Sequence, residues 1–117
     1  MPNNTWLKLS DATFYWQNQL ILNSVSLELS SRLTWLIGPS GVGKSTFLRI
    51  IAGHFLLQSG DCFVFNEPIR KPSPARAMVL QDFKLFPWLS VFDNVSIGMR
   101  FLKYDPDMIQ ERTIFLL

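Results

Sequence analysis

The sequence contains little of what several classes of protein need. It has one cysteine, Cys62, which excludes a disulfide within the chain, and one histidine, His54, which leaves no His/Cys constellation for a metal. Only 17% of its 117 residues are charged, against about 25% in typical domains. The net charge of +2 includes no basic run, so nucleic acid is not expected as a partner.

Long apolar runs and targeting signals are also lacking. No apolar stretch approaches the roughly 20 residues that a membrane-spanning helix needs. The opening residues, MPNNTWLKLSD, show no basic region followed by an apolar one, so no signal peptide is visible. These absences predict a cytoplasmic chain.

What is abundant is apolar and aromatic. Apolar residues make up 48% of the sequence, with ten Phe and four Trp, which argues against disorder. The low charge also predicts that another chain covers part of the surface. We interpret Cys62 as a small buried apolar residue and His54 as a solvent-facing turn residue. Asp105 or Asp107 is interpreted as the solvated cap of a helix, and the two are not expected to be a catalytic pair.

Hydrophobic patterns predict a mixed α/β chain. Loose alternation over 6–16 and clean alternation over 25–29 predict strands, the second one antiparallel and half-exposed. Continuous apolar runs predict buried strands, with that at 33–37 typical of a parallel sheet. Further elements are predicted in chain order: a largely buried helix over 44–52 that Gly53 ends, a strand after Gly60, a turn at 66–68, a short buried strand at 77–80, a helix from about Asp93-Asn94, and a last helix with Pro106 near its first turn.

The last predicted helix ends on four apolar residues, 114–117, without Gly, Pro or a polar finish. Natural helix ends usually show one of these. We therefore expect the sequence to be interrupted rather than finished here.

The segment GPSGVGKST, from Gly38 to Thr46, satisfies the pattern G-x-x-x-x-G-K-[ST] between a predicted strand and a predicted helix. Its glycines allow the backbone N–H groups to turn inward and form an anion-binding nest, to which the helix adds its positive end. In this pattern Lys44 reaches the β- and γ-phosphates of a nucleotide, and the Ser45 hydroxyl ligates Mg²⁺. The alternative is an ordinary glycine-rich loop with an exposed lysine.

Together with SGDCFVFNEPI and VLQDFKLFPWLSVFDNVSIG, this segment closely resembles the ATP-binding subunits of ABC transporters from Leu7 onward. LFPWLSVFDNV and WLIGPSGVGKST look most like importers for nitrate, sulfonates, taurine or pyrimidine precursors. The resemblance implies ATP and Mg²⁺ as ligands. It assigns nucleotide binding to Gly38, Pro39, Ser40, Gly41, Val42, Gly43, Lys44, Ser45 and Thr46.

The resemblance also implies roles outside this loop. Gln81 would be the glutamine that helps to ligate Mg²⁺ beside Ser45 and contacts the attacking water, so Lys44 and Gln81 would be catalytic. The alternative for Gln81 is a polar residue that ends a strand. Trp16 falls where the family stacks an aromatic ring on adenine, with Tyr15 beside it, although a core-facing strand aromatic is the alternative.

The implied partners lie at the membrane. The segment that carries Phe83, Leu85, Phe86 and Trp88 would meet the coupling helix of a membrane-spanning permease subunit, or these side chains would pack inward. A second nucleotide-binding subunit would complete a homodimer, and a periplasmic or surface solute-binding protein would act indirectly. The chain would then be peripheral on the inner face of the cell membrane.

Several family features are missing from the 117 residues. We find no apolar strand followed by Asp-Glu, no LSGGQ-type signature and no switch histidine, and Ser31-Arg32 replaces the usual Gly-Glu. The expected fold is therefore an incomplete α/β P-loop NTPase fold of the ABC ATPase type. An antiparallel β subdomain and the first part of the core would occupy about 1–92, and the start of a helical subdomain about 93–117.

The leading hypothesis is the N-terminal part of an importer's ATPase subunit. A non-catalytic nucleotide-binding or regulatory docking fragment, or a non-functional relic, is the alternative. A soluble phosphate-loop kinase is disfavoured by the Gln81 segment and by the lack of an acceptor-binding signature.

Overall fold

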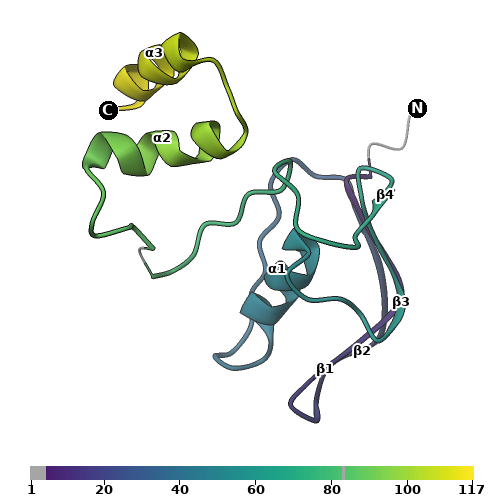
Figure 1. Ribbon diagram of the computed structural model, residues 1–117. Helices are drawn as coiled ribbons and strands as arrows, with labels where there is room; N and C mark the ends of the chain where they lie inside the picture. The colour runs from purple at the N-terminus through teal and green to yellow at the C-terminus, as the bar shows by residue number, and fades with distance from the viewer. Residues whose placement is uncertain (1–4, 83) are drawn as a thin grey trace. The chain divides into compact units, whose positions relative to one another are not determined.

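The computed structural model describes residues 5–82 and 84–117, which form two compact units (Figure 1). The first unit extends to Val79 and contains an antiparallel sheet and one helix. The second runs from Leu80 to Leu117 and contains two helices. The division of the chain into family subdomains near residue 92 stays a prediction.

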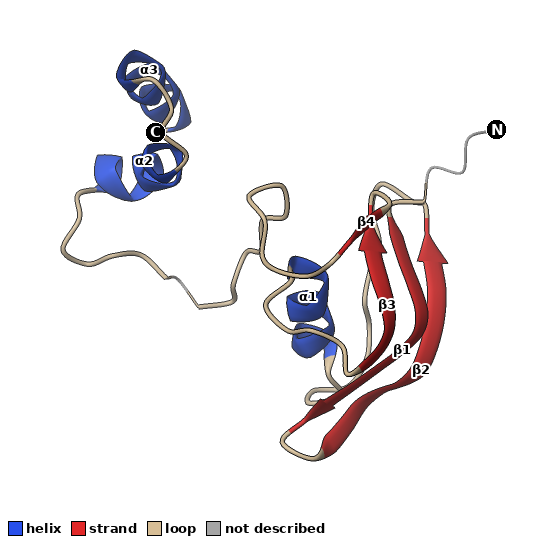
Figure 2. Cartoon of the chain, turned by 45° about the vertical axis from the view of Figure 1, so that its right-hand side comes forward, coloured by secondary structure: helices blue, strands red, loops and turns tan. Residues whose placement is uncertain are grey.

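The sheet of the first unit has four antiparallel strands in the order β2-β1-β3-β4 (Figure 2). The predicted strands at 6–16, 25–29 and after Gly60 are all present, the second one longer than expected. Their bounds are β1 Leu7–Trp16, β2 Gln19–Leu29, β3 Ser59–Val64 and β4 Glu67–Pro68.

Both hairpins of this sheet use two-residue turns with positive φ. Gln17 and Asn18 join β1 to β2 with φ of 45° and 65°, and Phe65 and Asn66 join β3 to β4 with φ of 49° and 65°. Positive φ at both central residues is the mark of type I′ turns, whose twist matches that of the strands they connect. The turn predicted around residues 66–68 is thus a tight hairpin.

Helix α1, Lys44–Ala52, covers one face of the sheet (Figure 2). Its Phe47 and Ile51 pack against a core formed by Leu7, Leu9, Ala12, Cys62 and Val64. The prediction for Cys62 is confirmed, and burial raises the pKa of its thiol to about 11, a shift that the charge of Arg76 opposes. Gly53 ends the helix as predicted, at φ 86°.

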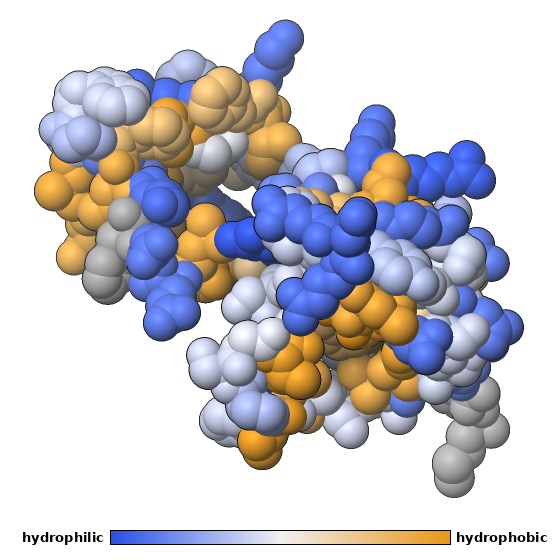
Figure 3. All heavy atoms as spheres, turned by 90° about the horizontal axis from the view of Figure 1, so that it is seen from below, coloured by the Kyte–Doolittle hydropathy of each residue, from blue (hydrophilic) through white to orange (hydrophobic). Residues whose placement is uncertain are grey.

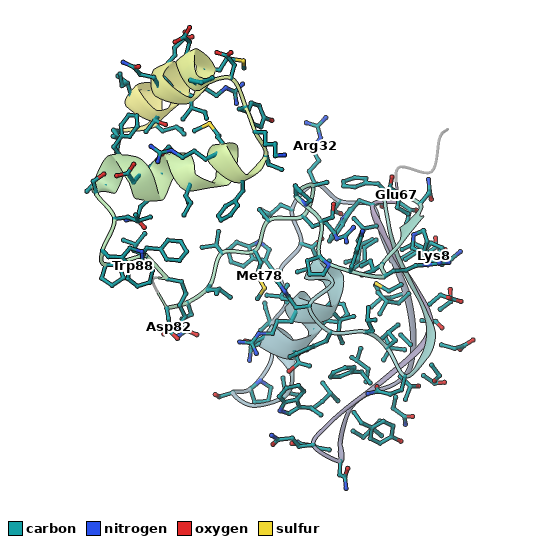
Figure 4. The ribbon with its side chains drawn as sticks, in the orientation of Figure 1. Lys8, Arg32, Glu67, Met78, Asp82 and Trp88 are labelled. Carbon is teal, nitrogen blue, oxygen red and sulfur yellow. The ribbon has the colours of Figure 1, made fainter. Side chains whose placement is uncertain are left out.

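The opposite face of the sheet carries polar side chains. Lys8 on β1 and Glu28 on β2 form an ion pair of 2.7 Å there, on the side away from α1 (Figure 4). Apolar and polar positions therefore alternate across the strands, as a half-buried sheet requires.

Two predicted strands are wrong. Residues 33–37 and 77–80 form no strand, and their apolar side chains are exposed: Trp35 by 79%, Ile37 by 88% and Val79 by 96%. A strand of a parallel sheet takes its hydrogen bonds from neighbouring strands, and the described strands pair only with one another. Helix α1 is likewise buried on one face rather than throughout, since Leu48 is exposed.

The second unit pairs helix α2, Val91–Phe101, with helix α3, Pro106–Leu116. Helix α2 begins two residues before the predicted Asp93. Asp105 caps α3, because its carboxylate accepts a hydrogen bond of 3.0 Å from the Asp107 N–H, and Pro106 occupies the first turn as predicted. The three described helices have nine to eleven residues, and none meets the length and hydropathy that membrane crossing requires.

Candidate functional site

The loop over 38–43 enters α1 through two residues with left-handed backbone. Gly41 has φ of 80° and Gly43 has φ of 108°, a conformation that residues with a Cβ rarely adopt. A Cβ added to Gly43 would also lie 2.6 Å from Cγ2 of Ile21 on β2. The glycines of the motif therefore let the loop curl tightly while it lies against the edge strand of the sheet.

The N-terminal end of α1 has no side-chain cap. Gly43 occupies the N-cap without a side-chain hydrogen bond, and the first turn contains no acidic residue. By contrast, the Ser90 hydroxyl caps α2 and the Asp105 carboxylate caps α3. The first N–H groups of a helix have no partner within it and carry partial positive charge. The end of α1 is thus open to an anion.

Lys44, the first residue of α1, folds back over this loop. Its Nζ donates hydrogen bonds to the carbonyl oxygens of Gly38, at 2.8 Å, and Pro39, at 2.6 Å. These bonds hold the ammonium group beside the curled backbone, where it adds a full positive charge to the helix end. The combination of an uncapped helix end and a cation held beside it suits a phosphate chain.

Ser45 and Thr46 follow in the first turn of α1, Ser45 exposed and Thr46 half-buried. A serine hydroxyl beside a phosphate is an oxygen ligand of the kind that Mg²⁺ accepts. Within the described part of the chain, no three His, Cys, Asp or Glu side chains gather to hold a metal. The exposed Ser45 hydroxyl fits a cation that phosphate oxygens also ligate.

Trp16 lies at the end of β1 and is 43% exposed. One contact is with Phe55, whose ring centroid lies 4.7 Å away at a tilt of 34°. Phe55 also stacks on Phe14 at 5.6 Å, and the Arg49 guanidinium lies 5.8 Å from its ring. Trp16 is thus a partly exposed member of an aromatic cluster, and stacking on adenine stays a prediction. His54 is exposed in the turn after α1, as expected.

The predicted residues beyond 80 belong to the second unit. Gln81 is exposed, and its catalytic role stays a prediction. Phe83 lies outside the described residues. Leu85, Phe86 and Trp88 are exposed, Trp88 by 76%, and the rings of Phe86 and Trp88 lie 5.4 Å apart (Figure 4). Of the two alternatives for these three side chains, outward exposure is the one observed.

Asn94, in the first part of α2, was not singled out from the sequence. Its side-chain oxygen accepts a hydrogen bond from the N–H of Phe86, and its side-chain nitrogen donates to the carbonyls of Phe86, Leu89 and Ser90. All four partners are backbone groups, so no sequence spacing signals them. Only the proximity of an Asn to a helix start and to an aromatic loop hints at such a role.

Comparison with known proteins agrees with the motif. The profile of the ABC transporter family matches residues 22–115. The spermidine/putrescine import ATP-binding protein PotA of Borrelia garinii subsp. bavariensis is 33% identical over 116 residues, covering 94% of this chain and 33% of that protein. The maltose/maltodextrin import ATP-binding protein MalK of Photobacterium profundum is 39% identical over 99 residues, covering 81% and 27%.

Among solved structures, cbiO1 from Clostridium perfringens, part of the ABC transporter complex cbiONQ, has a TM-score of 0.74 to this chain. It is 26% identical, and the match covers 93% of this chain and 47% of cbiO1. The chain spans about a third of the length of PotA and about a quarter of that of MalK. The profile match and the shared fold show that this chain belongs to the ABC transporter family, with the ATPase P-loop fold of its ATP-binding subunits.

Proposed function

We propose that this chain is the N-terminal portion of the ATP-binding subunit of an ABC importer, which couples ATP binding and hydrolysis to solute uptake. The observation that carries the proposal is the open N-terminal end of α1, with Lys44 held over a loop that curls at Gly41 and Gly43. Relatives from the same family bear the names of import ATP-binding proteins.

In the proposed complex, the backbone of residues 38–46 cradles the phosphates of ATP. The N–H groups of the loop and of the first turn of α1 point at phosphate oxygens. Lys44 gives up its two carbonyl partners and pairs with the β- and γ-phosphates, because a charge-assisted bond to phosphate is stronger than one to a neutral carbonyl.

Mg²⁺ bound beside the phosphates would neutralise the charge that develops on them as the terminal bond breaks. On this chain, the Ser45 hydroxyl and the Gln81 side-chain oxygen are the proposed ligands. Gln81 would also orient the attacking water through its amide. Both side chains are exposed and so are free to contact Mg²⁺ and water.

Trp16 is the proposed adenine platform. Phe55 supports its ring at 4.7 Å, so a base that stacks on the exposed part meets an aromatic surface already held in place. If Trp16 stacks on adenine, Trp16→Ala should weaken the binding of ATP. It should leave the binding of inorganic triphosphate unchanged, since triphosphate has no base.

Docking onto a membrane-spanning permease subunit is proposed for the exposed side chains of Leu85, Phe86 and Trp88. Aromatic residues are enriched at such interfaces, and the Phe86–Trp88 pair offers a ready anchor. Through this partner the chain would be peripheral on the inner face of the cell membrane. A second nucleotide-binding subunit would complete the ATP site, and a solute-binding protein would act indirectly.

The transported solute is left open in this proposal. The placement among importers for nitrate, sulfonates, taurine or pyrimidine precursors finds no support in the relatives. Their names specify polyamines, ferric ions, glycerol phosphate or maltodextrin. The proposal therefore extends to import of a small solute and no further.

Binding of ATP to the Lys44→Ala variant tests the proposal. Removing the only side-chain cation held over the loop among the described residues should weaken ATP binding at least tenfold, an effect of about 1.4 kcal/mol or more. Lys71→Ala is the matched control, because Lys71 is an exposed lysine away from the loop and should leave affinity unchanged. Isothermal titration with MgATP measures both.

Unchanged ATP affinity in Lys44→Ala would overturn the phosphate site. ATP turnover by the native protein distinguishes the proposed ATPase subunit from the alternative, a non-catalytic nucleotide-binding piece. ATP binding that depends on Lys44, together with no phosphate release from the native complex, would favour that alternative.

A further inference from the structure

The loop that precedes α2 is fastened by one side chain. Asn94 Oδ1 accepts a hydrogen bond of 2.8 Å from the N–H of Phe86, and Asn94 Nδ2 lies 3.1 Å from the Phe86 carbonyl oxygen. The same nitrogen donates to the carbonyls of Leu89, at 3.2 Å, and Ser90, at 3.0 Å. Within the loop, the Leu89 N–H donates to the Phe86 carbonyl at 3.0 Å. We call residues 85–90 the docking loop.

The docking loop turns its largest side chains outward. Trp88 projects from it, and its ring lies 5.4 Å from that of Phe86 (Figure 4). Besides this ring contact, the loop is shaped by the bond between Leu89 and Phe86, by the Ser90 cap on Asp93, and by the four contacts of the Asn94 side chain with its backbone. A loop already fixed in one conformation has less entropy to lose when its aromatic side chains meet a partner.

We propose that Asn94 is the positioning residue of the docking loop, which it holds in the conformation that presents Phe86 and Trp88 to the membrane subunit. The inference rests on the proposed function, because the membrane subunit is the occupant that the importer assignment supplies. Asn94 touches neither nucleotide nor partner in this proposal and acts through the loop backbone.

The chemistry of the side chain gives a way to separate this role from a purely structural one. A carboxamide offers an acceptor to the Phe86 N–H and two N–H donors, which the carbonyls of Phe86, Leu89 and Ser90 share. An aspartate has the same shape but no donor, so it would face those carbonyls with negative charge. At the fourth position of α2, however, aspartate is favoured by the helix dipole. Asn94→Asp should therefore remove the hydrogen bonds that hold the docking loop and leave helix α2 folded.

Hydrogen exchange on the purified native protein tests the positioning. In Asn94→Asp the amides of Phe86 and Leu89 should exchange about tenfold faster or more, since several hydrogen bonds are lost together. Amides in the later turns of α2 should keep their protection. Gln110→Ala is the control, because Gln110 is an exposed polar residue on α3 and should change neither set.

Unchanged exchange at Phe86 and Leu89 in Asn94→Asp would overturn the inference. Loss of protection throughout α2 would also overturn it, since Asn94 would then support the helix rather than the loop. Asn94→Ala, which removes the side chain without adding charge, should release the same two amides.

Cross-linking of the native protein in its own membranes tests the docking step. A photoreactive benzoylphenylalanine at Leu85 leaves Phe86 and Trp88 in place and should form an adduct with a multi-spanning membrane protein, identified by mass spectrometry. Asn94→Asp should reduce that adduct at least severalfold. An equal yield in both proteins would contradict the positioning role. No such adduct even with Asn94 intact would contradict the proposed docking, while the exchange data would still decide what Asn94 does to the loop.

Discussion

Gly41 and Gly43 both have positive φ, but their surroundings differ. A Cβ on Gly41 would meet nothing within 4 Å, whereas one on Gly43 would lie 2.6 Å from the Ile21 side chain. Backbone strain alone therefore acts at Gly41, and strain and steric overlap act together at Gly43. The sequence motif does not distinguish the two positions in this way, because the overlap depends on how β2 lies beside the loop.

Alanine substitutions should separate the two effects. Gly41→Ala should lower the free energy of unfolding by about 1–2 kcal/mol, the usual strain of left-handed backbone. Gly43→Ala should lower it further, and Ile21→Ala in the same chain should recover only the steric part. Gly98→Ala is the control, because Gly98 lies inside α2 with open space around it and alanine is the better helix former by about 1 kcal/mol. Urea unfolding of the native protein measures all four variants.

Equal losses for Gly41→Ala and Gly43→Ala would show that the contact with Ile21 does not constrain the loop. A loss for Gly98→Ala would show that helix propensity is not what decides stability at that position.

The sequence predicts the residues of a phosphate loop because their spacing is tied to one chemistry, and their contact with a nucleotide stays a prediction. Gly38, Gly43, Lys44 and Ser45 are recognised by order and interval alone, and the structure places them around the open end of α1. Asn94 could not be predicted in this way. Its partners are backbone carbonyls and one N–H, which every residue possesses, so only the folded loop reveals the bonds.

At the scale of elements, alternation proved the more reliable signal. The strands with polar and apolar positions in turn are present, because one face of a half-buried sheet can be satisfied by a single helix. The continuous apolar runs at 33–37 and 77–80 form no strand. Such runs describe a strand covered on both faces and paired on both edges. Their structure therefore depends on neighbours that local sequence does not supply.

Helix α2 begins earlier than predicted because of its cap. The Ser90 hydroxyl accepts a hydrogen bond of 3.1 Å from the Asp93 N–H and donates one of 2.6 Å to the Asp93 carboxylate. Arg100 pairs with the same carboxylate at 2.7 Å. The predicted start at Asp93-Asn94 thus fell inside the first turn, where a capping pair fixes the helix.

Removing this cap should weaken α2 measurably. Ser90→Ala should lower the free energy of unfolding by about 1 kcal/mol, because the N–H of Asp93 loses its acceptor. Ser90→Thr keeps a hydroxyl and should recover most of that loss. Urea unfolding followed by circular dichroism compares the native protein with its two variants. A Thr variant as unstable as the Ala variant would contradict the capping role.

The same cap makes the stability of α2 depend on pH, and the direction of that dependence follows from the pKa of Asp93. The hydrogen bond from Ser90 lowers the pKa of the Asp93 carboxyl below its ordinary value, an effect that Arg100 strengthens and partial desolvation opposes. The folded state therefore favours the ionised group. Its contribution is present above the ordinary pKa of aspartate, about 3.9, and is lost as the pH falls through the lowered folded value. Ser90→Ala should flatten this acid dependence.

At the scale of the whole molecule, the prominent feature is apolar surface. Figure 3 shows apolar side chains at the surface of both units, and the exposed residues include Leu33, Trp35, Leu36, Ile37, Val79, Leu80, Ile114, Phe115, Leu116 and Leu117. Contiguous exposed apolar surface usually marks a place where protein meets protein. The low charge of the sequence, 17%, already predicted that other surfaces would cover part of this chain.

The 117-residue chain by itself should therefore self-associate and unfold without a sharp transition. In Trp35→Lys/Ile37→Lys, two of the most exposed apolar side chains become charged, which should shift the chain toward monomer because charge opposes apolar contact. Ser30→Lys/Ser31→Lys is the matched control. It adds the same charge to the same exposed stretch but leaves the apolar side chains in place, so association should persist if apolar burial drives it. Light scattering after size exclusion measures the mass of each. A monomeric unsubstituted chain with a cooperative thermal transition would contradict the prediction, and equal effects of the two pairs would assign association to net charge instead.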